Sequence, residues 1–105
     1  MTDQSIAAAR LLELIDARVA PVVVDVRSHR EFNAGHVPGA INIPFWTTLT
    51  APIPATVEDR VVVYCGHGPR AVAARTALRW RGFRRVTLLP GHMAAWKAAG
   101  LREEM

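Results

Sequence analysis

The sequence predicts an α/β protein with a mostly parallel sheet that is covered by helices on both faces. Two observations predict this class. Short apolar runs rich in β-branched residues, such as VVVDV and RVVVY, are typical of strands that are buried on both faces. Segments with a helical period lie between these runs. Strands and helices therefore alternate along the chain, which favours parallel strands joined by helical crossovers.

The size and composition are those of one globular domain, which we expect over residues 1–105. Half of the residues are hydrophobic, yet no apolar stretch approaches the roughly 20 residues that cross a membrane. The first residues include an acid and no basic cluster, unlike a secretion signal. Because a single cysteine cannot form an internal disulfide, we expect the reducing environment of the cytoplasm.

The net charge is +4, and twelve of the thirteen basic residues are arginines. These arginines are scattered along the chain, and the densest cluster is RWRGFRR, residues 79–85. Few aromatic residues lie between them. We therefore expect a solvated surface and no nucleic-acid partner.

The first half of the chain is predicted to form two helices and two strands. The first helix is predicted from apolar residues at the spacing i, i+3, i+4 and i+7, which are Ala8, Leu11, Leu12 and Ile15. Ser5 is its predicted N-cap. Residues 21–26 form a buried strand, and Ser28 caps a short helix over SHREF. A turn and a very short strand, residues 41–43, follow. Residues 44–59 hold three prolines and no clear period, which predicts a loop with one helical turn around Trp46.

The second half is predicted to form two strands and two helices. Residues 60–65 form a second buried strand, and residues 85–89 form another. Residues 70–80 form a helix that Gly82 ends. On this helix one face carries Ala73, Ala77 and Trp80, and another carries Arg75 and Arg79. Residues 92–99 form the last helix, and a glycine follows it.

The only cysteine, Cys65, lies where the second buried strand stops and a glycine-rich turn begins. Sites in open α/β sheets lie beyond the carboxyl ends of strands. Gly66 and Gly68 allow N–H groups to turn inward, and Pro69 stiffens the turn just before the helix that begins near Arg70. The positive end of this helix points back at the turn. With Arg70 these features favour the anionic, reactive sulfur and predict a nucleophile in an anion-binding loop. The alternative is an inert buried cysteine at a strand end.

Three segments resemble signatures of the rhodanese (sulfurtransferase) family. They are VVVDVRSHREFNAGHVPGAINIP (22–44), VVVYCGHGPRA (61–71) and GFRRVTLLPGHMAAWKAAGL (82–101), in the order and spacing of the family. Together they cover most of the chain. The resemblance implies a rhodanese-like fold, which is a five-stranded parallel sheet flanked by helices on both faces.

The resemblance also implies a chemistry. Cys65 would attack the outer sulfur of a small anionic donor, such as thiosulfate, and become a persulfide. Cyanide or a thiol, including the thiol of a protein, would then remove that sulfur. No metal or organic cofactor is implied, because the sulfur is carried by the cysteine itself. The loop that would hold the persulfide comprises Gly66, His67, Gly68, Pro69, Arg70 and Ala71.

Two alternative functions stay open. A sulfur carrier or regulatory binding module would deliver persulfide sulfur to a protein partner without turnover of small donors. Phosphatases of related fold have five residues between cysteine and arginine, whereas four lie between Cys65 and Arg70. The shorter loop makes a smaller cradle, which suits a sulfur atom better than a phosphoryl group.

Other polar residues are expected to support the loop. Asp25 ends a buried strand and Arg27 follows two residues later, so their side chains point to the same side. We expect them to fix the backbone by hydrogen bonds. Glu31 is a candidate partner that would hold Arg70 in place, the alternative being a surface acid. His36 is expected to bind its own turn rather than to take part in catalysis.

The remaining histidines and the tryptophans are expected to have structural roles. His67 is expected to shape the entrance, and the four histidines share no metal-ligand spacing. Trp46, Trp80 and Trp96 are expected in the core or along a groove, with Trp46 at the mouth of the site. The family often has serine at the position of Ala71 and glycine at that of His92. We expect His92 to cap the last helix rather than to reach the site.

Overall fold

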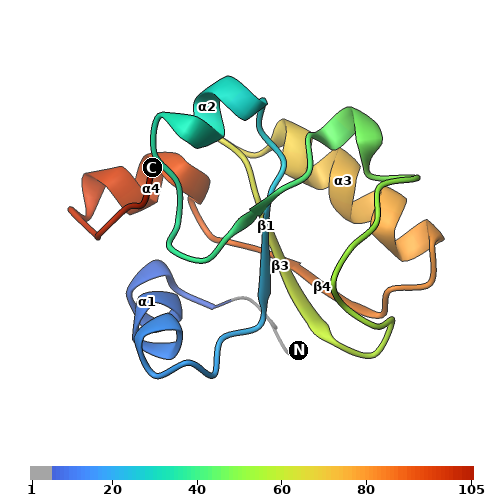
Figure 1. Ribbon diagram of the computed structural model, residues 1–105, viewed down its shortest axis with the longest axis horizontal. Coiled ribbons are helices and arrows are strands. Elements are labelled where there is room, and N and C mark those ends of the chain that lie inside the picture. The colour runs from blue at the N-terminus through green and yellow to red at the C-terminus, as the bar shows by residue number, and fades with distance from the viewer. Residues whose placement is uncertain (1–5) are drawn as a thin grey trace.

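The computed structural model describes residues 6–105, and its strands form one parallel sheet in the order β2-β1-β3-β4 (Figure 1). The strands are β1 (Val22–Asp25), β2 (Ile41–Asn42), β3 (Arg60–Tyr64) and β4 (Arg85–Leu88). The helices are α1 (Ala8–Asp16), α2 (His29–Asn33), the 3-10 turn η1 (Phe45–Thr47), α3 (Pro69–Trp80) and α4 (His92–Ala98). Among residues 6–105, no helix has the length and apolar character needed to cross a membrane.

The expected fold class is confirmed, with one difference in the sheet. Four strands pair within residues 6–105, whereas the family resemblance implied five. These four strands are the ones that the sequence predicted. Residues 6–105 contain no further β-branched run that predicts a fifth strand. The predicted loop at 44–59 is also confirmed, with its single helical turn at η1.

Side chains alternate between the two faces of the sheet along β3 and divide the core into two clusters. Val61, Val63 and Cys65 lie in the cluster that includes the buried residues of α3. Val62 and Tyr64 lie in the other cluster, with the buried residues of α1 and α4. Figure 1 shows α3 on one side of the strands and both α1 and α4 on the other. The nucleophile candidate therefore belongs to the α3 face.

Capping fixes where α2 begins. The backbone N–H of Glu31 donates to Ser28 Oγ at 3.2 Å, and the Glu31 carboxylate accepts the backbone N–H of Ser28 at 3.1 Å. This reciprocal capping box satisfies two N–H groups that the helix itself leaves free. The prediction that Ser28 caps this helix is confirmed. The cap predicted for the first helix, Ser5, lies outside the described residues, and α1 begins after Ala7.

The buried face of α3 differs from the one that the sequence suggested. Ala71, Ala74 and Leu78 are fully buried, at positions i, i+3 and i+7. Trp80 follows Leu78 by two residues, which is about 200° around the helix, and it is 83% exposed. The prediction that Trp80 lies in the core or a groove is therefore wrong. Trp96, in contrast, is fully buried as expected.

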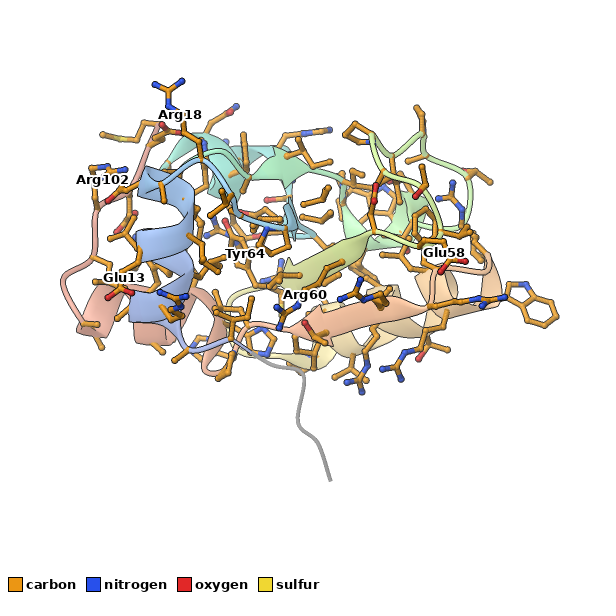
Figure 2. The ribbon with its side chains drawn as sticks, turned by 90° about the horizontal axis from the view of Figure 1, so that it is seen from below. Glu13, Arg18, Glu58, Arg60, Tyr64 and Arg102 are labelled. Atoms are coloured by element: carbon orange, nitrogen blue, oxygen red, sulfur yellow. The ribbon has the colours of Figure 1, made fainter. Side chains whose placement is uncertain are left out.

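A buried ion pair between Asp25 and Arg27 lies at the end of β1, beside Tyr64 of β3. The Asp25 carboxylate accepts the backbone N–H of Arg27 at 2.9 Å and its Nη2 at 2.8 Å, and Nη2 also donates to the carbonyl of Gly35 at 2.7 Å. The Arg27 guanidinium lies 5.7 Å from the ring centre of Tyr64. The Tyr64 hydroxyl, in the interior of the molecule (Figure 2), accepts the backbone N–H of Val37 at 3.0 Å. These bonds fix the segment that follows β1.

The two charges of this pair compensate each other. Burial alone would lower the pKa of Arg27, but the hydrogen bonds and charge of Asp25 outweigh it and the pKa is raised. Asp25 is fully buried and Arg27 nearly so. Loss of one partner would therefore leave an uncompensated charge in the core.

We predict that Asp25→Ala lowers the free energy of unfolding by ~3–5 kcal/mol, because it leaves the Arg27 charge buried without its partner. The matched control is Glu13→Ala, which breaks an exposed pair with Arg10 and should change stability by less than ~0.5 kcal/mol. Urea unfolding of both variants measures the difference. Equal effects of the two substitutions would contradict the importance of the buried pair.

Candidate active site

The candidate nucleophile, Cys65, follows the last residue of β3 and is fully buried. Its side chain packs in the cluster that contains Val63 and Ala71. The strands of the sheet are parallel, so β1 and β3 end at the same edge, where Asp25 pairs with Tyr64. Cys65 thus emerges at the edge where open α/β sheets carry their sites.

The loop after Cys65 turns a backbone N–H toward the sulfur. The N–H of Gly68 donates to Cys65 Sγ at 3.0 Å. Gly68 has φ = +136°, a conformation that L side chains rarely adopt, so glycine suits this turn. Pro69 then begins α3, whose partial positive charge also lies at the loop. Both features stabilise negative charge on the sulfur.

Arg70 is held by Glu31. Its Nη1 and Nη2 donate to the two carboxylate oxygens of Glu31 at 2.6 and 3.1 Å. The hydrogen bond from Arg70 lowers the pKa of Glu31 to about 2, and the same bond raises the pKa of Arg70, to which Cys65 adds a smaller effect. The expected pairing of Glu31 with Arg70 is therefore present, and it connects the start of α2 with the start of α3.

The start of α4 holds the loop from another side. The N–H groups of Met93 and Ala94 donate to the carbonyls of Cys65 and Gly66 at 2.9 and 3.1 Å. The Nδ1 atom of His92 accepts the backbone N–H of Cys65 at 3.2 Å. Both the amide and the carbonyl of Cys65 are thus bound by α4.

The role predicted for His92 is wrong. The N-cap of α4 is Gly91, and no side chain caps this helix. His92 is buried and reaches Cys65 instead, because the turn before α4 directs its side chain toward the loop. The presence of histidine at a position where the family often has glycine was the signal that could have predicted this contact.

The loop residues differ in their exposure. Gly68 and Ala71 are buried, Gly66 and Arg70 are partly exposed, and His67 and Pro69 are exposed. Trp46, predicted at the mouth, is 63% exposed and stacks edge-on against Phe45. The exposed surface of the loop therefore lies over a sulfur that solvent does not reach.

The other predicted residues lie farther along the scaffold. Asp25 and Arg27 hold the segment after β1, as described above. His36 is hydrogen-bonded through Nδ1 to the carbonyl of Phe32 at 2.8 Å, and its ring stacks on that of Phe32. Its backbone pairs with Glu104. Tyr64, which the sequence analysis did not single out, joins this scaffold through its hydroxyl group.

This arrangement can do nucleophilic chemistry through sulfur. Within the described part of the chain, no three His, Cys, Asp or Glu side chains gather as a metal site would require. The site consists of one thiol, backbone N–H groups and a paired arginine. Such a site can form a covalent adduct on sulfur and stabilise its charge by the backbone.

Comparison with known proteins gives the family. A family model described as a rhodanese-like domain matches residues 7–99. Thiosulfate sulfurtransferase 16 of Arabidopsis thaliana, a chloroplastic protein, is 33% identical over 74% of this chain and 75% of its own length. The crystal structure of a rhodanese-related protein from Thermoplasma volcanium is 31% identical, with a TM-score of 0.77 over 95% of this chain and 96% of that one.

The matching region also occurs within longer proteins. An HTH-type transcriptional regulator of Mycobacterium tuberculosis is 37% identical over 96% of this chain and 50% of its own length. The chain spans about half the length of two of the curated relatives that it matches, this regulator among them. The similarity to the regulator therefore concerns one part of that protein.

We predict that Glu31 stabilises the fold at neutral pH and that this stabilisation is lost in acid. The pKa of this group is about 2 in the folded protein, against an ordinary 4.5, so the unfolded chain binds the proton first as the pH falls. The stabilisation is complete above pH 4.5 and is lost as the pH falls toward 2. In urea unfolding between pH 5 and 2.5, Glu31→Gln should show a shallower loss of stability than the parent protein. Identical slopes would contradict this prediction.

Proposed function

The chain belongs to the rhodanese-like domain family, and from this premise we propose that it is a sulfurtransferase that carries sulfane sulfur as a persulfide on Cys65. The donor would be thiosulfate or a similar small anion, and the acceptor cyanide or a thiol. A relative that matches most of this chain carries the name thiosulfate sulfurtransferase, which supports this donor class. The single cysteine suits a reducing compartment such as the cytoplasm.

The reaction would proceed in two displacements. In the first, the Cys65 thiolate attacks the outer sulfur of thiosulfate, the sulfur–sulfur bond of the donor breaks, and sulfite leaves with its electron pair. In the second, cyanide or a thiolate attacks the outer sulfur of the persulfide and the Cys65 thiolate leaves. With cyanide the products are sulfite and thiocyanate, and the enzyme returns to its starting state without a net oxidant or reductant.

The observation that carries this proposal is the N–H of Gly68, which points at Cys65 Sγ from 3.0 Å. A donor N–H at the sulfur stabilises the thiolate before the attack and when it leaves again. An inert buried cysteine does not need such a donor or the glycine at φ = +136° that presents it. The short loop of four residues between Cys65 and Arg70 favours a sulfur adduct over a phosphoryl adduct.

A second candidate, a sulfur carrier, is favoured by one specific observation. Cys65 is fully buried, so a donor or acceptor meets the sulfur only when the loop above it moves. A partner protein that binds the exposed His67 and Pro69 could drive this movement, whereas small anions depend on spontaneous opening. A carrier would therefore hold its persulfide until a protein thiol removed it.

We predict that thiosulfate adds one sulfur atom to the protein and that cyanide then releases it as thiocyanate. Intact-mass spectrometry detects the first step, and a colorimetric thiocyanate assay follows the second. Cys65→Ser keeps a side chain of similar size and should lose both signals, with circular dichroism as the control for folding. Sulfur loading or thiocyanate production that persists in Cys65→Ser would refute the assignment of the nucleophile.

The enzyme and carrier readings give different rates of discharge. After the protein has been loaded with sulfur, equal concentrations of cyanide, glutathione and a reduced dithiol protein are compared in single-turnover reactions. An enzyme with small acceptors should discharge with all three, and in a separate assay with excess thiosulfate and cyanide it should turn over repeatedly. Discharge by the dithiol protein at least ~10-fold faster than by glutathione or cyanide, with no repeated turnover with cyanide, would establish the carrier and exclude the enzyme.

A further inference from the structure

His92 has a backbone conformation that is unusual for its residue type. Its φ is +54°, in the left-handed region, and it follows Gly91 with φ = +73° and ψ = −5°. The N–H of His92 donates to the carbonyl of Leu89 at 3.0 Å, which closes a tight turn with Pro90 and Gly91 at its centre. Glycine would fit the position of His92 without strain, so the conformation itself does not require histidine.

The imidazole of His92 faces the loop at two points. Its Nδ1 accepts the N–H of Cys65 at 3.2 Å. A Cβ placed on Gly68 would lie 3.4 Å from its Nε2, so the other side of the ring lies against Gly68. The same ring therefore accepts a hydrogen bond from the residue that carries the sulfur and lies beside the residue whose N–H points at that sulfur.

The hydrogen bond that His92 accepts fixes the protonation state of its imidazole ring. Nδ1 can accept the N–H of Cys65 only if it carries no proton, so the ring is the neutral tautomer with its proton on Nε2. Burial lowers the pKa of His92, and the charge of His67 lowers it further, which favours this neutral form.

We propose that His92 is a positioning residue, whose neutral imidazole holds the amide of Cys65 and thereby fixes the loop that binds the sulfur. This inference deepens the proposed function and rests on it for its effect on the reaction. The amide of Cys65 is buried, so without His92 it would lack its acceptor and the loop would rearrange to find another. Rearrangement would move the N–H of Gly68 away from Sγ.

Two substitutions separate the acceptor from the backbone conformation. His92→Asn keeps an acceptor, because Asn Oδ1 is as many bonds from the backbone as His Nδ1, and Asn tolerates positive φ. His92→Gly suits the same φ but removes the acceptor. Since both residues fit the turn, both variants should fold, and circular dichroism with thermal melting checks this.

Three measurements test the proposal. In ¹⁵N-labelled parent protein, long-range ¹H–¹⁵N spectra should show His92 with its proton on Nε2. Hydrogen exchange of the Cys65 amide should be at least ~10-fold faster in His92→Gly and near the parent rate in His92→Asn. The rate of sulfur loading from thiosulfate should fall ~10-fold in His92→Gly and return to within ~2-fold of the parent in His92→Asn.

Each other result overturns the proposal or part of it. A proton on Nδ1, or a His92→Gly variant equal to the parent in exchange and loading, would show that the contact does not hold the loop. Failure of His92→Asn to restore the rates would show that the acceptor is not what matters. If the parent protein itself takes no sulfur, the proposed function fails, while ring spectrum and amide exchange still decide whether His92 holds Cys65.

Discussion

Strands β1 and β3 end side by side, with Asp25 opposite Tyr64, and the rest of the site depends on this register. Because side chains alternate along a strand, the pairing sends Tyr64 to the face of α1 and α4 and Cys65 to the face of α3. A shift of one residue would exchange the two faces and place the thiol in the wrong cluster. At this end of the strands, the backbone N–H of Val26 donates to the carbonyl of Tyr64 at 3.0 Å, and the Arg27 guanidinium, paired with Asp25, lies over the Tyr64 ring.

The loop itself is held by two elements from distant parts of the chain, α2 and α4. Glu31 caps α2 and, with the same carboxylate, binds Arg70 at the start of α3. The N–H groups at the start of α4 bind the loop carbonyls, and His92 binds the amide of Cys65. The backbone around the sulfur is thus fixed by contacts between segments that are far apart in the sequence, so each contact depends on the whole sheet being formed.

Local patterns allowed much of this to be predicted from the sequence. The strands are continuous β-branched runs, Ser28 and Glu31 have the spacing of a capping box, and Cys65 stands between a strand and a glycine turn. Two features that tertiary contacts decide were predicted wrongly, although the contact of Glu31 with Arg70 was anticipated. The exposure of Trp80 follows from which face of α3 meets the sheet, and the contact of His92 follows from how a left-handed turn directs its side chain. Neither is contained in a periodic pattern.

The charge balance of the site has a further consequence for its chemistry. Arg70 makes two bonds to Glu31, so its positive charge is already neutralised within the protein. It acts as a tether for the start of α3 more than as a free cation for an incoming anion. The negative charge of a thiolate or persulfide on Cys65 would then be met chiefly by backbone N–H groups, led by that of Gly68, and by the positive end of α3. Stabilisation of this kind depends on how the N–H groups point at the sulfur rather than on the net charge around it. The contacts that fix the loop backbone therefore matter more here than the number of nearby arginines.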